Sequence, residues 1–132
     1  MDPTALLASL NTEQREAVTA PIGNYLVLAG AGSGKTRVLV HRMAWLLEVE
    51  NSPFGIFAVT FTNKAAHEML ERVQALLGGR SHAVWVGTFH GLAHRFLRMH
   101  WQEAGLVAEF QIMDSDDQLR LIRRVMKEVG VD

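Results

Sequence analysis

The chain has 132 residues, of which 48% are hydrophobic and 20% charged, and it carries a net charge of −1 and no cysteine. This length and composition suit one globular domain with its own core, and the lack of cysteine excludes disulfides and thiolate metal sites. A net charge near zero means that nucleic-acid binding would depend on local patches. Because the sequence shows neither a long apolar run nor a signal peptide, we expect a cytoplasmic protein without a membrane segment.

Two short helices are predicted at the start of the chain. Asp2–Pro3 is typical of a helix start, and leucines at helical spacing follow it. Asn11 can cap a second helix, and Gln14, three residues later, could close a capping box with it. From chemistry alone, a purely structural role explains Gln14 as well as a functional one does. The second helix should end at Pro21–Asn24.

The segment Tyr25–Leu47 has the order of a phosphate-binding loop: an apolar, buried strand at Tyr25–Ala29, a glycine-rich turn, then an apolar-periodic helix. Glycines let backbone N–H groups converge on phosphate oxygens, and the start of a helix carries partial positive charge. Lys35 would contact the outer phosphates, and the Thr36 hydroxyl would bind Mg²⁺. The alternative, a glycine-rich hairpin that precedes a lysine by chance, does not explain the order of strand, loop and helix.

The turn departs from the usual motif at one position, because Ala29 stands where the first glycine is expected. Three later glycines remain to form the turn. The candidate residues around the phosphates are Ala29, Gly30, Ala31, Gly32, Ser33, Gly34, Lys35 and Thr36.

Strands and helices continue to alternate after this helix. A turn at Asn51–Pro53 leads to a strand at Gly55–Phe61, a helix capped by Asn63 runs to Gly78–Gly79, and a third strand covers Ala83–Val86. This alternation predicts parallel βαβ units, in which ligands bind at the carboxyl ends of the strands. Those ends carry Gly30–Thr36, Thr60–Lys64 and Gly87–His90.

The stretch Thr60–Lys64 combines an aromatic ring, hydroxyls, an amide and a cation at one of these strand ends. Such a set can bind single-stranded nucleic acid through stacking and backbone contacts. The alternative is structural, with Phe61 in the core and Asn63 as a helix cap only. The residues alone leave both interpretations open.

The last third of the chain is predicted to be helical, with an apolar face that includes Leu92, Phe96, Leu97 and Met99. Phe110–Asp114 could be a strand that ends in a magnesium-assisting carboxylate, but Gln111 interrupts it, and Asp114 is well placed to cap the final helix. Capping is the favoured interpretation. His90 and His94 have a spacing that metal sites use, but without a third ligand they are more typical of ordinary histidines.

Taken together, several motifs in order resemble the UvrD/Rep/PcrA branch of superfamily 1 DNA helicases, over nearly the whole chain. The motifs are LNTEQREAV (Leu10–Val18), LVLAGAGSGKTRVLVHR (Leu26–Arg42), AVTFTNKAAHEM (Ala58–Met69), WVGTFHGLAHRFLR (Trp85–Arg98) and FQIMDSDDQLRLIRR (Phe110–Arg124). Alanine at position 29 agrees with the loop of this family. The resemblance also supports the capping role of Asp114, because it places that residue in an inserted helical subdomain.

The resemblance implies roles for individual residues. Gln14 would read the edge of adenine and Arg37 would pack on its ring, so both join the ATP-binding residues. TFTNKAA and GTFHGLAHR are similar to two single-stranded DNA motifs of the family. The candidate DNA contacts are therefore Phe61, Thr62, Asn63, Lys64, Thr88, Phe89 and His90.

The fold implied by the resemblance is a P-loop NTPase of the RecA-like type, α/β with a parallel sheet flanked by helices. Residues 1–89 would be the N-terminal part of the first RecA-like domain, and residues 90–132 the start of the helical insertion. The acidic DExx motif, the arginine fingers and the second RecA-like domain of the family have no counterpart here, so the chain is predicted to be an N-terminal fragment.

The implied function is the ATP-binding part of an ATP-dependent 3′ to 5′ DNA helicase acting in DNA repair. Its cofactors would be ATP and Mg²⁺, and its partners single-stranded DNA, the remainder of the helicase and repair proteins. The fragment itself is expected to be inactive. A stand-alone nucleotide- or DNA-binding module is the alternative, and a small P-loop kinase is a third, although no cluster of arginines for a kinase lid stands out.

Overall fold

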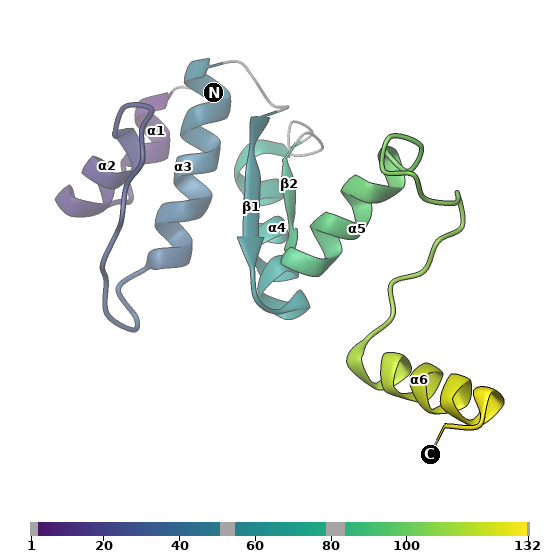
Figure 1. The fold of residues 1–132 in the computed structure, drawn as a ribbon. Coiled ribbons are helices and arrows are strands. Elements are labelled where there is room, and N and C mark those ends of the chain that lie inside the picture. Colours follow the sequence, from purple (N-terminus) through teal and green to yellow (C-terminus); the bar gives the residue numbers. More distant parts are fainter. Residues whose placement is uncertain (1–2, 51–54, 79–83, 132) are drawn as a thin grey trace. The chain divides into compact units, whose positions relative to one another are not determined.

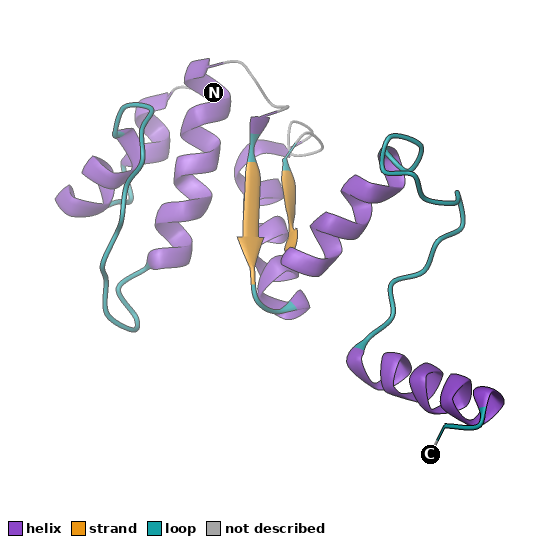
Figure 2. Ribbon diagram, viewed as in Figure 1, coloured by secondary structure: helices purple, strands orange, loops and turns teal. Residues whose placement is uncertain are grey.

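The structure is a computed structural model that describes residues 3–50, 55–78 and 84–131. The chain divides into two compact units, Met1–Leu92 and Ala93–Asp132, and each is described by itself. Figures 1 and 2 show the elements. In order they are α1 (Pro3–Leu7), α2 (Thr12–Thr19), α3 (Lys35–Glu50), β1 (Phe57–Thr60), α4 (Asn63–Leu77), β2 (Trp85–Thr88), α5 (Phe89–Met99) and α6 (Ser115–Val129).

Strands β1 and β2 form a parallel pair, with Phe57 opposite Trp85 and Thr60 opposite Thr88. Helix α4 connects them, so the predicted parallel βαβ unit is confirmed. The rings of Phe57 and Trp85 lie 4.9 Å apart between centroids. Strand β1 is shorter than the predicted strand Gly55–Phe61. Strand β2 includes Gly87 and Thr88, which the prediction placed after the strand.

The core of the first unit lies between α3 and α4, because each helix turns an apolar stripe inward at helical spacing. Leu6 of α1 also belongs to this core, and so does Val84, the residue directly before β2. The buried residues of this core are Leu6, Val40, Met43, Ala44, Leu47, Met69, Val73, Leu77 and Val84.

The predicted buried strand at Tyr25–Ala29 is wrong for this structure. The segment has no strand pairing, and the side chains of Leu26 and Leu28 are 83% and 84% exposed. A strand needs a neighbour to satisfy its backbone hydrogen bonds. In the described residues β1 and β2 pair only with each other, so this apolar segment has no neighbouring strand.

Two helix starts in the first unit test the predicted caps. Asn11 caps α2, and its capping box with Gln14 is present in both directions. For α4 the prediction was wrong by one residue, because Thr62, in an extended conformation, accepts from the amide of Ala65 at 3.1 Å. Asn63 is already inside the helix. A threonine with its backbone in the β region can place its hydroxyl over the first helical turn, which explains the shift.

Gly78 ends α4 with a positive φ of 56°, as predicted for this end. Several predicted positions lie outside the described residues: the cap Asp2, the turn Asn51–Pro53, and the residues Gly79 and Ala83.

The second unit contains the predicted helix cap. Asp114 accepts from the amide of Asp117 at 2.8 Å and begins α6, so the capping interpretation is confirmed. The apolar residues of α6 stay about half exposed, as do Phe96 and Met99 of α5, so the predicted apolar face of α5 is only partly buried. Ion pairs Asp117–Arg120 and Arg124–Glu128 balance the basic side of α6.

Within the described ranges, none of the helices combines the length and the apolar character that crossing a membrane requires.

Candidate functional site

The glycine-rich turn is closed by its own backbone and passes directly into α3. The amide and the hydroxyl of Ser33 both donate to the carbonyl of Gly30, at 3.3 and 2.7 Å. Gly32 and Gly34 have φ values of 75° and 86°, which lie in the left-handed region that favours glycine. The amide of Val38 donates to the carbonyl of Gly34 at 2.9 Å, and this bond begins the helical ladder.

Lys35, the first residue of α3, bends back over the turn. Its ammonium donates to the carbonyls of Ala29 and Gly30, at 2.9 and 2.8 Å. The positive charge is therefore held at the mouth of the turn, beside the start of a helix, where anions are favoured.

Gln14 connects α2 to the same turn. Its side-chain oxygen accepts from the amide of Asn11 at 3.2 Å, and its side-chain nitrogen donates to the carbonyl of Ser33 at 3.0 Å. The side chain thus caps a helix and contacts the loop at once. A Cβ added to Gly34 would lie 2.8 Å from the nitrogen of Gln14, so a larger residue there would displace the end of the Gln14 side chain.

These residues line an open cavity of about 550 Å³, whose wall includes Gln14, Ala29, Ser33 and Lys35 together with apolar side chains of α3. Thr36 is half-buried in the first turn of α3, and Arg37 is exposed. Neither lines this cavity. The structure therefore brings Gln14, the turn and Lys35 together, and Arg37 lies next to the turn, with its Cβ 3.8 Å from a Cβ built at Gly34.

Arg42, further along α3, is a residue with contacts to α2 that the sequence reasoning does not identify. Its guanidinium donates to the carbonyls of Val18 at 2.7 Å, Ala20, and Pro21 at 3.2 Å, at the end of α2. The signal in the sequence is an arginine inside the apolar pattern of α3, between the buried residues His41 and Met43.

A second group of candidates lies at the carboxyl ends of β1 and β2. Phe61 is 90% exposed and Phe89 is 59% exposed, and their rings meet edge to face at 5.9 Å. The core interpretation of Phe61 is therefore wrong. Asn63, Lys64 and His90, close to these phenylalanines in the sequence, are also exposed.

Two threonines in this group have structural contacts. Thr62 caps α4, and the hydroxyl of Thr88 accepts from the amide of Gly91 at 3.1 Å at the start of α5. Figure 1 shows the turn before α3 and the carboxyl end of β1 at the same end of the first unit. The group that follows β1 and β2 thus lies at the edge at which parallel α/β sheets bind ligands, and the turn lies toward the same end of the unit.

A parallel βαβ unit and a glycine-rich turn that opens a helix define a class, the α/β proteins with a P-loop-type turn. The model of the UvrD/REP helicase N-terminal domain matches residues 10–132, and the chain belongs to this family. Membership implies a RecA-like P-loop fold.

The chain is similar to two named groups of bacterial proteins. It is 63% identical to DNA helicase II of Escherichia coli strain K12 over 133 residues, which cover 100% of the chain and 18% of the relative. It is 49% identical to the ATP-dependent DNA helicase PcrA of Staphylococcus aureus strain Mu50, over 97% of the chain and 18% of the relative. The chain therefore spans about a fifth of the length of these relatives.

The Gly34→Ala substitution should lower the free energy of unfolding and displace Gln14. Its φ of 86° costs an L residue about 1–2 kcal/mol, and the new methyl group would meet the Gln14 nitrogen. Urea unfolding measures the stability, and the side-chain amide resonance of Gln14 in an NMR spectrum reports its displacement.

The matched control is Gly30→Ala, because Gly30 has no positive φ and an added Cβ would meet nothing within 4 Å. Equal stability of the two variants would contradict the geometry assigned to Gly34.

Proposed function

We propose that the chain is the N-terminal, ATP-binding part of an ATP-dependent 3′ to 5′ DNA helicase that acts in DNA repair, and that it binds ATP–Mg²⁺ and single-stranded DNA. The family match over residues 10–132 and the names of the relatives support this proposal. The observation that carries it is the bond from Gln14 to the carbonyl of Ser33, because it joins a candidate base-reading residue to a candidate phosphate loop.

The triphosphate would bind at the turn and the start of α3. Charge-assisted hydrogen bonds to phosphate are roughly twice as strong as neutral ones, so phosphate would compete well for the ammonium that Lys35 now gives to two carbonyls. The Thr36 hydroxyl would bind Mg²⁺. The residues proposed to surround the phosphates are Ala29, Gly30, Ala31, Gly32, Ser33, Gly34, Lys35 and Thr36.

Gln14 would read the base. A glutamine amide has two N–H groups and an oxygen with two lone pairs, and the bonds to Ser33 and Asn11 use one of each. The other N–H and lone pair match N7 and the N6 amino group of adenine, whereas guanine offers two acceptors, N7 and O6, at the same edge. Capping and adenine reading are therefore compatible in one side chain. Arg37, exposed in the first turn of α3, would pack on the adenine ring.

Single-stranded DNA would bind at the exposed pair Phe61 and Phe89. Base–aromatic stacking accepts any base, and the exposed Lys64, three residues after Phe61, would add a cation for the phosphates. Thr62, Asn63, Thr88 and His90 complete the proposed contacts.

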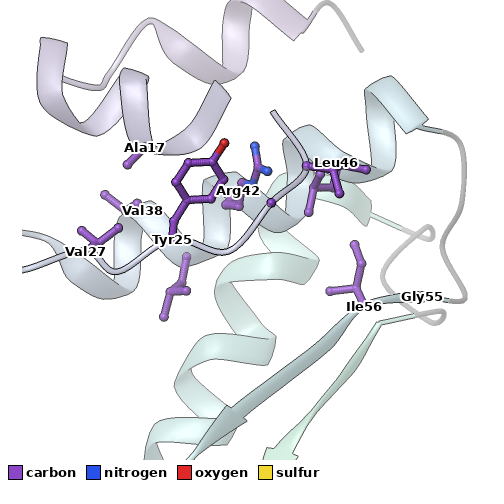
Figure 3. A pocket seen from close by; sticks show the side chains of 11 residues that line it. Ala17, Tyr25, Val27, Val38, Arg42, Leu46, Gly55 and Ile56 are labelled. Carbon is purple, nitrogen blue, oxygen red and sulfur yellow. The ribbon is translucent and has the colours of Figure 1, made fainter. Parts of the chain in front are cut away.

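Among the described residues no strand pairs with Tyr25–Ala29, which fits the proposal that the rest of the helicase completes a larger parallel sheet. An open cavity of about 490 Å³ separates Tyr25 and Val27 from Gly55 and Ile56 near the start of β1 (Figure 3). Residues 1–89 would form the start of the RecA-like domain and residues 90–132 the start of the helical insertion, which the division after Leu92 supports. The whole helicase would also contact repair proteins.

Lys35→Ala should remove most binding of ATP–Mg²⁺, because the ammonium is the cation at the mouth of the turn. The unmodified chain should bind ATP more tightly than GTP. Titration calorimetry of both nucleotides tests this, with Lys127→Ala on α6 as the control. Equal affinity for ATP and GTP would show that the role assigned to Gln14 is wrong.

Phe61→Ala should weaken single-stranded DNA binding by about 1–3 kcal/mol, the range measured for base–aromatic stacking. Fluorescence anisotropy with a labelled oligothymidine measures it, and the affinity of both proteins should fall as salt rises. Phe57→Ala is a matched control, since Phe57 is half-exposed at the other end of β1. An unchanged affinity in Phe61→Ala would exclude the stacking role.

The chain alone should not hydrolyse ATP at a meaningful rate, with or without single-stranded DNA. An arginine finger alone contributes about 10³–10⁵ in rate, and Lys35 and Thr36 supply neither that finger nor a catalytic carboxylate. A phosphate-release assay on the chain and on Asp114→Ala tests this, because Asp114 is bound to the amide of Asp117 as a cap. DNA-stimulated turnover that disappears in Asp114→Ala would identify Asp114 as an acidic motif and contradict the prediction.

A further inference from the structure

Arg42 connects α3, the helix that follows the glycine-rich turn, to α2, the helix that carries Gln14. It lies seven residues, or about two turns, beyond Lys35 on α3. Its guanidinium donates to three carbonyls at and just beyond the end of α2: those of Val18, of the C-cap Ala20 and of Pro21, which follows the helix. Figure 3 shows its side chain at the same cavity as Ala17 of α2 and Tyr25.

These contacts provide hydrogen-bond donors for carbonyls at the C-terminal end of α2. The last carbonyls of a helix have no donors within the helix, and a cation at that end also interacts favourably with the helix dipole. The planar guanidinium presents several N–H groups in fixed directions, so one arginine can satisfy several of these carbonyls. An eight-residue helix such as α2 is marginal by itself, and its position depends on packing and on contacts of this kind.

The other half of α2 carries the base-reading candidate. Gln14 caps the helix with Asn11 and donates to the carbonyl of Ser33 at 3.0 Å. Gly34 approaches so closely that a methyl group there would lie 2.8 Å from the Gln14 nitrogen. A small rotation or shift of α2 would therefore break the contact between Gln14 and the loop, and Arg42 together with the buried Val18 resists that movement.

We propose that Arg42 is a positioning residue for base selection: it holds α2 on α3 so that Gln14 stays against the loop and reads adenine. This inference rests on the proposed role of Gln14 in nucleotide binding. The phosphate-binding turn and Lys35 do not depend on the position of α2 in this way, because they are continuous with α3 itself. Arg42 thus affects recognition of the base and not recognition of the phosphates.

The test compares three ligands, ATP, GTP and inorganic tripolyphosphate, each with Mg²⁺, in the chain and in Arg42→Gln. We expect the affinity for ATP to fall roughly tenfold, which corresponds to the loss of about one well-placed hydrogen bond, and the preference for ATP over GTP to disappear. The affinity for tripolyphosphate should stay within about twofold, because the turn and Lys35 are unchanged. Arg42→Lys should recover part of the preference, since an ammonium can still donate to these carbonyls.

The matched control is Arg15→Gln. Arg15 also donates to a backbone carbonyl at a helix end, that of Leu7 at 3.0 Å, but it joins α2 to α1 and not to α3. Its loss should leave the preference for ATP unchanged. If Arg42→Gln unfolds, as judged by circular dichroism, Arg42→Lys and the hydrogen exchange of the Gln14 side-chain amide provide the same test, because exchange should be faster when α2 is loosened.

A double-mutant cycle separates this inference from the proposed function. In the chain, Gln14→Ala should remove the preference for ATP, and in the Arg42→Gln background it should have no further effect. If Gln14→Ala changes nothing, the proposed role of Gln14 is overturned and the role of Arg42 falls with it. If Gln14→Ala removes the preference but Arg42→Gln keeps it, or lowers tripolyphosphate affinity as much as ATP affinity, the inference about Arg42 alone is overturned.

Discussion

Burial of one side of α3 fixes the axis of this helix, and so the direction of its first turn, where the candidate nucleotide-binding residues lie. Val40, Ala44 and Leu47 are in the core with residues of α1 and α4. Burial of a valine or leucine side chain contributes about 1.5–3 kcal/mol, so the helix axis is held by residues further along the helix than the loop itself. An anion site at a helix start needs this constraint, because the N–H groups of the first turn keep their directions only while the axis is fixed. The same helix then positions α2 through Arg42.

The side chains at the loop differ in how readily they would exchange their present partners. Lys35 carries a full charge and is bound to neutral carbonyls, so an arriving phosphate would offer it a stronger partner. Gln14 is neutral and is bound to the Ser33 carbonyl on one side and to the Asn11 amide on the other. It has less to gain from exchange, and it can hold the loop in place before a nucleotide binds. Such preorganisation lowers the entropy that binding would otherwise lose.

The sequence predicts features that depend on residues a few positions apart, and the alternation of strands and helices also predicts the parallel pair β1–β2. It does not predict the distant partners of single segments or side chains. The capping box of α2 and the glycine turn are local, and both are present. Tyr25–Ala29 has the composition of a central strand, but a strand is completed by its neighbours, which the described residues do not supply. Arg42 is missed for a similar reason, since its acceptors lie on another helix. The cap of α4 shows a finer limit: Thr62 and Asn63 are both good caps, and only the backbone conformation selects Thr62.

The threonine hydroxyls at the starts of α4 and α5 help to fix the backbone next to the exposed residues Phe61 and Phe89. A ring that is 90% exposed gains almost nothing from the hydrophobic effect, so its position must be set by its backbone. Phe61 lies between the last residue of β1 and the cap Thr62, and Phe89 directly follows the cap Thr88 at the end of β2. Because β1 and β2 are paired in register, fixing each backbone also fixes where the two side chains begin, and their edge-to-face contact at 5.9 Å then orients the rings. An aromatic surface held in this way loses little freedom when a base stacks on it, which is the property that a single-strand binding site requires.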